Sequence, residues 1–272
     1  MERVRSLLYV ERRLAGPGRG LFSAFETATA LGSRLTLAAV VPDPPPSYGP
    51  RHSAPGAARA RQSRAWTWQR RLDGLASRGR LRGIDVETRI LRGEAAEAVV
   101  REAVRREHDL VMKVADTDSL LWPWQIDTTD RRILRHAPCP VWVLDPAQGA
   151  LVRVVLAAVD VDPDRSPALN EQIVRTAARL ADRTGAQLHV LHAWCIPGES
   201  ILASPMRGVS RRRLKSLLTL TGRERRRRVE RLVSRVAPDA DAVITVCKGR
   251  PITAIRKQAR LTEADVVVVG NA

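Results

Sequence analysis

The sequence predicts an α/β protein made of two similar doubly wound domains, and three observations support this fold class. First, 272 residues are enough for two ordinary domains, each with its own core. Second, strand-like apolar runs alternate with amphipathic helical segments, which is typical of a parallel sheet covered by helices on both faces. Third, the second half of the chain repeats the first in the same order.

The internal repeat consists of segments that keep a nearly constant spacing. Three pairs share an offset of 156 residues (249 − 93) without a gap: 85–90 with 241–246, Gly93 with Gly249, and 109–112 with 265–268. Upstream, residues 7–11 align with residues 156–160, which places Glu11 at the position of Asp160. The repeat predicts a first domain over residues 1–147 and a second over residues 150–272.

The second copy shows the alternation of strands and helices most clearly. An almost unbroken apolar run at 152–159 is typical of a strand buried on both faces. Residues 170–184 have apolar side chains at helical spacing and end at Gly185, a common helix terminus. Further strands are expected at 188–194, 241–246 and 266–269, and further helices at 223–236 and 251–259, the last with proline in its first turn.

The first copy follows the same plan, including a long helix at 57–78. Together the copies predict two open parallel sheets in the flavodoxin-like strand order. The second copy is expected to be incomplete, because Ala272 aligns with Asp116 while the first copy continues to Asp145. About 29 residues (145 − 116) would be missing after its fourth strand. The strand at 266–269 would then form an open edge, which predicts self-association, for example as a homodimer.

Positive charge is concentrated in one stretch of the second copy. The chain carries 46 Lys+Arg against 29 Asp+Glu, a net charge of +17, and residues 207–235 hold twelve basic and two acidic residues, or +10. One interpretation is an anionic partner, such as nucleic acid, an acidic membrane surface or an acidic protein. Seven arginines would contact it: Arg211, Arg212, Arg213, Arg225, Arg226, Arg227 and Arg228.

The other interpretation of this stretch is a solvated helix face whose arginines reflect codon bias, since only four of the 46 basic residues are lysine. The stretch has no aromatic residue, which argues against a binder of single-stranded nucleic acid. Gly222 is expected to break or bend the helix.

Composition and motifs disfavour several classes of protein. No apolar run reaches the roughly 18–20 residues of a transmembrane helix, and the N-terminus lacks the apolar core of a signal peptide. Three cysteines that lie far apart are too few for a disulfide scaffold and fit a reducing cytoplasm. No nucleophile elbow, Walker loop or dinucleotide fingerprint is present, so we expect no enzyme.

Two positions at strand ends are candidate ligand contacts, because open parallel sheets bind ligands beyond the carboxyl ends of their strands. Asp160 follows the first strand of the second copy, where a carboxylate could accept hydrogen bonds from an adenine or a ribose. It could equally cap the turn before Pro163. Gly270 follows the fourth strand, where backbone N–H groups could approach a phosphate. The first copy has no glycine between Gly93 and Gly149.

A third pattern, formed by His189, His192 and Cys195, has the spacing of a metal site. On a strand, however, residues three apart point to opposite faces, so both imidazoles cannot easily reach one ion. We therefore expect no metal site.

The repeat, Asp160 and the Gly-Arg-Pro turn at 249–251 resemble the universal stress protein family, and specifically its tandem members. The segments 108–113, 128–135 and 140–143 are similar to the E-type branch of that family. The resemblance implies two adenine nucleotide alpha hydrolase-like domains in a cytoplasmic stress-response protein with no settled catalytic reaction. The branch is associated with resistance to DNA-damaging agents and oxidative stress.

Nucleotide-binding members of the family carry a Gly-x2-Gly-x9-Gly-Ser/Thr loop after the fourth strand. The first copy departs from that pattern completely, and the second keeps only Gly270. No cofactor is therefore expected. Binding of ATP through Asp160 and Gly270 stays open as an alternative function.

Overall fold

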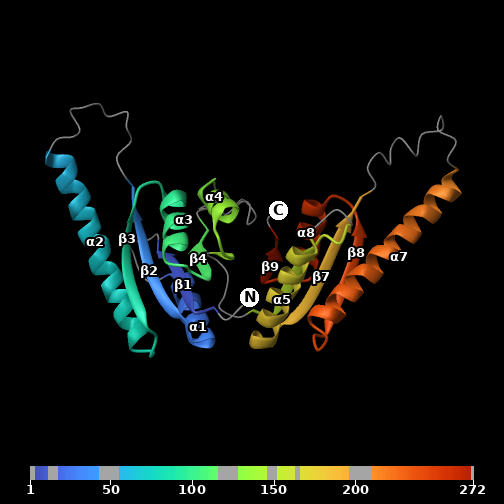
Figure 1. Cartoon of the computed structure of the whole chain (residues 1–272), viewed down its shortest axis with the longest axis horizontal. Helices are drawn as coiled ribbons and strands as arrows, with labels where there is room; N and C mark the ends of the chain where they lie inside the picture. The colour runs from blue at the N-terminus through green and yellow to red at the C-terminus, as the bar shows by residue number, and fades with distance from the viewer. Residues whose placement is uncertain are drawn as a thin grey trace. The chain divides into compact units, whose positions relative to one another are not determined.

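The computed structural model describes residues 4–11, 18–42, 55–115, 128–145, 152–162, 166–195 and 210–270. Contacts between residues divide the chain into two compact units, 2–150 and 151–272. Each unit is a parallel sheet with helices packed against it (Figure 1). The expected α/β class, in two tandem copies, is confirmed.

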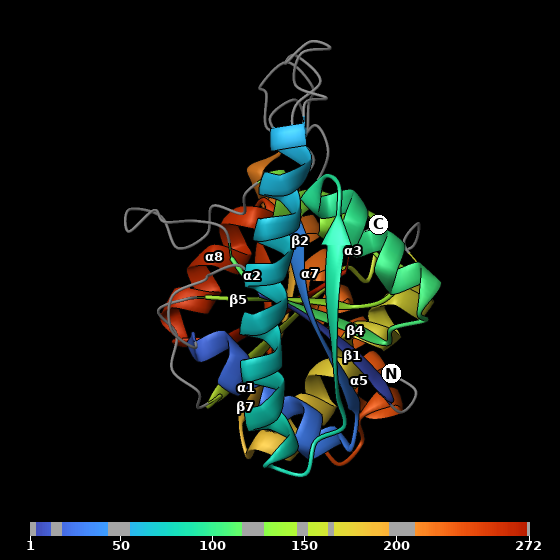
Figure 2. The ribbon, with the colours of Figure 1, turned by 90° about the vertical axis from the view of Figure 1, so that its left-hand side faces the viewer.

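The first unit contains a five-stranded parallel sheet. Its strands lie side by side in the order β3 (Val86–Arg92), β2 (Arg34–Val41), β1 (Ser6–Glu11), β4 (Leu110–Val114) and β5 (Val141–Leu144). Its helices are α1 (Arg19–Leu31), α2 (Pro55–Arg80), α3 (Ala95–Arg105) and α4 (Thr128–His136). Val99 of α3 and Ile133 of α4 pack with Leu8 of β1 on one face of the sheet. Figure 2 looks onto α2, which runs along β2 and β3.

The second unit contains a four-stranded parallel sheet among the described residues. Its strands lie in the order β8 (Ala242–Lys248), β7 (Gln187–Trp194), β6 (Val154–Val159) and β9 (Val266–Val269). Its helices are α5 (Pro167–Thr184), α7 (Arg211–Val236) and α8 (Pro251–Leu261). Val174 of α5 and Val229 of α7 share one core with Val155 of β6, whereas Ala259 of α8 packs on the opposite face with Leu191.

The strand order corrects the flavodoxin-like prediction. In both units the chain moves outward from the first strand to the second and third, and then returns to place the fourth strand on the other side. This order, 3-2-1-4 with a fifth strand in the first unit, follows the doubly wound order 3-2-1-4-5-6 rather than the flavodoxin order 2-1-3-4-5. The sequence could not distinguish them, because strands alternate with helices identically in both.

Equivalent carboxylates fix the start of the first strand in each unit. Asp109 Oδ2 accepts hydrogen bonds from the backbone N–H groups of Arg5 and Ser6, at 2.8 and 3.0 Å. In the second unit, Asp265 Oδ2 accepts the corresponding bonds from Arg153 and Val154, at 2.7 and 3.0 Å. The offset of 156 residues between Asp109 and Asp265 therefore reflects a shared structure.

Helix α7 differs from the helix expected at 223–236. It begins at Arg211, where the Ser210 side chain accepts a hydrogen bond from the backbone N–H of Arg213, and it runs through Gly222 without a break. The Trp194 ring lies 3.4 Å from the point that a Cβ on Gly222 would occupy. A methyl group would therefore fit against this indole, and the expected break or bend at Gly222 is wrong, because the helix is continuous from Arg211 to Val236.

The fourth strand of the second sheet, β9, pairs only with β6 among the described residues. The first sheet continues instead from β4 to β5. An open edge at β9 is thus present in the described part of the chain. The predicted truncation of the second domain after this strand stays a prediction.

Candidate ligand site in the second domain

The candidate site lies where β6 ends, in the segment that contains Asp160 and Asp162. Asn170, in the first turn of α5, holds the start of this segment with two hydrogen bonds. Its Oδ1 accepts from the Asp160 backbone N–H at 2.9 Å, and its Nδ2 donates to the Asp160 carbonyl at 2.6 Å. The Asp160 carboxylate in turn accepts the Asp162 backbone N–H at 3.3 Å. Asp160 therefore shapes a turn, as one of the two interpretations predicted, while remaining at the carboxyl edge of the sheet.

His192 of β7 lies beside these carboxylates. The parallel register pairs Val159 with His192, so the imidazole sits next to the end of β6. The His192 side chain is fully buried, and its Nδ1 lies 3.1 Å from the Val159 carbonyl oxygen. A ring nitrogen must carry a proton to bond a carbonyl, so Nδ1 is the donor. Burial lowers the pKa of His192 below its usual value and favours the neutral ring, which leaves Nε2 unprotonated.

Three potential ligand atoms meet at this point. One atom each from Asp160, Asp162 and His192 lies within 4.8 Å of the other two. His192 Nε2 is 3.8 Å from Asp162 Oδ1 and has no hydrogen-bond partner in the described ranges. From the sequence, Asp160 was a candidate ligand contact, His192 was grouped with His189 and Cys195, and Asp162 was not singled out. Only the pairing of β6 with β7 brings this histidine to the aspartates.

Two arginines of α7 close one side of the site. Arg225 Nε lies 2.8 Å from Asp162 Oδ1, and this guanidinium is only 18% exposed. Arg228 donates to the Val161 carbonyl at 3.4 Å and forms an ion pair with Glu224 at 2.7 Å. The two side chains therefore hold the 160–162 segment instead of pointing into solvent.

Gly270 follows β9, the strand next to β6, at the same edge of the sheet. A Cβ on Gly270 would lie 2.8 Å from Leu169 and 3.0 Å from Ile173, both on α5. Those distances are too short for carbon atoms in contact, so α5 requires glycine at this position. Close packing explains Gly270 without a phosphate.

Strand pairing corrects the alignment of Glu11 with Asp160. Glu11 pairs with Ala39, and Val159 pairs with His192. Because Ala39 and His192 are equivalent (192 − 39 = 153, the same offset as the helix-ending Gly185 and Gly32), Glu11 corresponds to Val159. The sequence alignment was one residue out of register, since both strands are apolar throughout.

Side chains fill the corresponding edge in the first unit. Lys113 of β4 and Asp130 of α4 form an ion pair in which both side chains are almost completely buried. The next residue, Val114, occupies the position of Gly270 (270 − 114 = 156). Its Cγ2 lies so close to Gly20 of α1 that a Cβ there would collide with it. Among its described residues, the first unit thus shows no group of carboxylates like that of Asp160 and Asp162.

A model of the universal stress protein family matches residues 16–145 and 152–272, which is most of the chain. The chain belongs to the universal stress protein family. Its two matches correspond to the two sheets, so the protein is a tandem member, as the repeat predicted.

Curated relatives of this universal stress protein include proteins named universal stress protein E. The protein from Escherichia coli (strain K12) is 31% identical over 119 residues, which cover 41% of this chain and 37% of that protein. The protein from Photorhabdus laumondii is 28% identical over 121 residues, with the same two shares. The similarity is distant, and the chain covers little more than a third of these relatives.

Two solved structures share the fold over almost the whole chain. A functionally unknown protein from Pseudomonas aeruginosa PAO1 has a TM-score of 0.71 at 24% identity, covering 99% of this chain and 82% of that one. A universal stress protein from Archaeoglobus fulgidus DSM 4304 has a TM-score of 0.64 at 13% identity, covering 97% and 86%. At these identities the likeness establishes the fold.

The arginine-rich stretch of this universal stress protein is partly engaged in ion pairs. Besides Arg225 and Arg228, Arg226 pairs with Glu230 at 3.0 Å. The exposed members of the predicted set are Arg212, Arg213, Arg226 and Arg227, and the side chain of Arg211 lies outside the described residues. The surface that could attract an anion is therefore smaller than the sequence indicated.

The remaining predicted positions are explained by local structure. His189 Nε2 lies 3.1 Å from Gln187 Oε1, whereas His192 faces the Val159 carbonyl, so the two imidazoles do not meet. No helix in the described ranges is long and apolar enough to cross a membrane.

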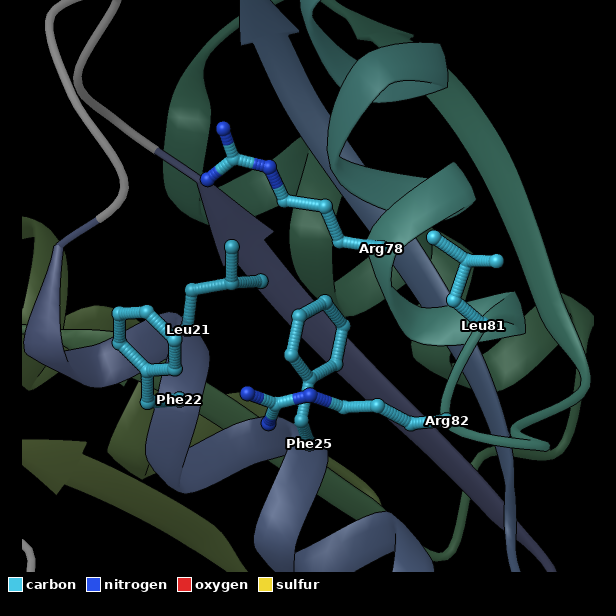
Figure 3. Close-up of a pocket in the computed structure, with 6 residues that line it drawn as sticks. All are labelled: Leu21, Phe22, Phe25, Arg78, Leu81 and Arg82. Carbon is cyan, nitrogen blue, oxygen red and sulfur yellow. The ribbon is translucent and has the colours of Figure 1, made fainter.

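A cavity of about 270 Å³ opens in the first unit of this universal stress protein (Figure 3). Its lining has no carboxylate, imidazole or thiol: Leu21, Phe22, Phe25, Arg78, Leu81 and Arg82.

Proposed function

We propose that this universal stress protein acts in the cytoplasm without catalysing a reaction, and gives resistance to DNA-damaging agents and oxidative stress by binding a ligand or partner through its second domain. The contrast between the two strand edges supports the proposal. In the first domain Val114 and the Lys113–Asp130 pair fill the edge. In the second domain Asp160 and Asp162 are partly exposed there.

The non-enzymatic part of the proposal rests on the local chemistry. Ser6 Oγ lies 2.7 Å from His108 Nδ1, the contact expected of a nucleophile and its base. However, His108 is buried, and within the described ranges its Nε2 has no hydrogen-bond partner, so no carboxylate there is bonded to the ring. A structural role for this pair at the start of β1 explains both observations.

The proposal is tested by survival of cells in which the gene is deleted. We expect greater killing by ultraviolet light and hydrogen peroxide than in the parent, and restoration by the wild-type gene but not by the Asp160→Asn/Asp162→Asn variant. Asp239→Asn, in an exposed turn before β8, is the matched control and should restore survival. Equal survival of the parent and the deletion strain would contradict the proposal.

A nucleotide-binding function is the first alternative, with ATP held through Asp160 and Gly270. The position of both residues at the carboxyl edge favours it, and the close packing of Gly270 under α5 opposes it. Thermal unfolding with increasing ATP and Mg²⁺ separates the two functions. Saturable stabilisation that Asp160→Asn abolishes would favour nucleotide binding, whereas an unchanged midpoint agrees with the proposal.

Binding of an anionic polymer by the helix within 207–235 is the second alternative. The exposed side chains of Arg212, Arg213 and Arg227 favour it. Duplex DNA should then bind more weakly as salt rises, independently of its sequence. Replacing these three arginines by alanine should reduce both the affinity and the salt dependence, and unchanged binding would exclude the idea.

Self-association through β9 is a separate proposal about partners. Two observations favour it: the edge of β9 that has no neighbouring strand among the described residues, and the 55% exposure of Val269. Sedimentation should show a mass that rises with protein concentration and falls to the monomer in Val269→Lys. Val243→Lys, on the opposite edge strand β8, should leave association unchanged. A monomer at all concentrations would contradict the proposal.

A further inference from the structure

The fully buried imidazole of His192 has a ring nitrogen for which the described part of the chain provides no hydrogen-bond partner. Its Nδ1 proton is used by the Val159 carbonyl, so Nε2 presents a lone pair. The nearest carboxylate atom, Asp162 Oδ1 at 3.8 Å, also presents a lone pair. Two acceptors that face one another at the edge of a core repel, and a cation between them would turn that repulsion into attraction.

The distances are suited to a transition-metal ion. Zinc forms bonds of about 2.0–2.2 Å with imidazole nitrogen and carboxylate oxygen, so two ligand atoms on a tetrahedral ion lie about 3.4 Å apart. The 3.8 Å between His192 Nε2 and Asp162 Oδ1 is close to that separation. Asp160 has a ligand atom within 4.8 Å of both, and a side-chain adjustment of roughly 1–1.5 Å would complete a three-ligand set.

From this juxtaposition we propose that Asp160, Asp162 and His192 bind a divalent transition-metal ion, with Zn²⁺ as the best match. One nitrogen and two carboxylate ligands favour zinc over Mg²⁺ or Ca²⁺, which prefer oxygen ligands alone. The hydrogen bond from Nδ1 to the Val159 carbonyl is the outer support that metal-binding histidines commonly have. Three protein ligands leave a fourth position open to water or a small ligand.

Arg225 is the built-in competitor for this ion. Its guanidinium is 2.8 Å from Asp162 Oδ1, so a bound metal must share or displace that positive charge. Removing the guanidinium should therefore tighten metal binding, while it would weaken a site that needs the arginine to recognise an anion. The site lies in the second domain alone and does not depend on the proposed function.

The test is the Zn²⁺ affinity of the full chain, measured by competition with a chromophoric chelator. All variants carry Cys195→Ser, because this exposed thiol could bind zinc by itself. Asp162→Asn and Asp160→Asn should each weaken binding by at least about tenfold, the loss typical of a disturbed metal shell. Arg225→Gln should strengthen binding, and the exposed carboxylate variant Asp239→Asn should leave it unchanged.

A second readout separates a metal site from a folding defect. Co²⁺ in the wild-type site should give visible absorption bands that Zn²⁺ removes, and His192→Gln should abolish them while thermal unfolding stays cooperative. If His192→Gln fails to fold, Asp162→Asn replaces it, because Asp162 is partly exposed; this variant should likewise lose the Co²⁺ absorption bands. Equal Zn²⁺ affinities in the wild type, Asp160→Asn and Asp162→Asn would overturn the proposal, as would weaker binding in Arg225→Gln.

Discussion

Val114 at the end of β4 packs directly on Gly20 of α1, with no room for a Cβ between them. In the second domain the small residue lies on the strand and the large residue on the helix. Gly270 stands at the equivalent strand position, and Ile173, which is equivalent to Gly20 (173 − 20 = 153), supplies the bulk from the helix. The two halves thus fill the same contact from opposite sides.

We expect Gly20→Ala to destabilise the first domain by about 1–3 kcal/mol, the usual cost of inserting a methyl group into a packed core. Adding Val114→Ala should recover part of that loss, because the smaller strand residue makes room for the new methyl. The measurement is urea unfolding of the two single variants and the double variant. Their deviation from additivity gives the coupling between the two positions.

Gly74→Ala is the matched control for this series, since Gly74 lies in α2 with no atom near its Cβ position. It should stabilise the protein by about 0.5–1 kcal/mol through helix propensity. A Gly20→Ala variant as stable as Gly74→Ala would show that the contact with Val114 is not restrictive.

The buried pair of Lys113 and Asp130 should respond asymmetrically to substitution. Lys113→Met leaves the Asp130 carboxylate buried without this cation, and we expect a loss of about 3–5 kcal/mol. The double variant Lys113→Met/Asp130→Leu removes both charges and should lose less. Urea unfolding provides the comparison, with Arg226→Ala in the exposed Arg226–Glu230 pair costing at most about 0.5 kcal/mol. A double variant less stable than Lys113→Met would contradict the expectation.

His108 should make the fold less stable in mild acid. Burial lowers its pKa in the folded state, so the unfolded chain takes up the proton first as the pH falls below about 6.5. The stability that the neutral ring contributes is present above that pH and is lost as the pH falls toward the lowered pKa. Urea unfolding between pH 7.5 and 5 should show a smaller decrease for His108→Gln than for the wild type. Parallel curves would argue against this assignment.

The three cysteines should differ in their rate of alkylation. Cys195 is exposed, whereas burial raises the pKa of Cys139 to about 11 and also raises the pKa of Cys247. At pH 8 only about one in a thousand Cys139 thiols is the reactive thiolate. Mass spectrometry after brief treatment with iodoacetamide should find the label on Cys195. Rapid labelling of Cys139 in the folded protein would show that its thiol is accessible.

Patterns confined to one element predicted the fold well. The apolar runs located β6 and β9, because a strand buried on both faces consists almost entirely of apolar residues. Gly185 marked the end of α5, because a helix that ends in the left-handed conformation usually has glycine there. The first half of α7 also has a helical pattern, with Leu214, Leu217 and Leu218 at helical spacing. The error was the break or bend expected at Gly222, because the glycine by itself does not show that one helix continues from Arg211 to Val236.

Relations between elements were harder to predict. The strand order and the true partner of Glu11 depend on which strands pair and in which register, and uniformly apolar strands do not specify either. For the same reason the candidate site was recognised only through Asp160. His192 lies 30 residues beyond Asp162 (192 − 162), and parallel pairing alone makes them neighbours.

The position of β6 between β7 and β9 has a consequence for folding during synthesis. Val155 pairs with Val266, so one edge of β6 has no partner strand until 111 more residues (266 − 155) have been translated. At about 10 residues per second, this interval lasts roughly 10 s. The first domain passes through a similar interval, because Leu7 of β1 pairs with Leu110 of β4, 103 residues later (110 − 7). During each interval a strand from the middle of a sheet is exposed on the ribosome, so slow translation or a chaperone deficit should affect both domains.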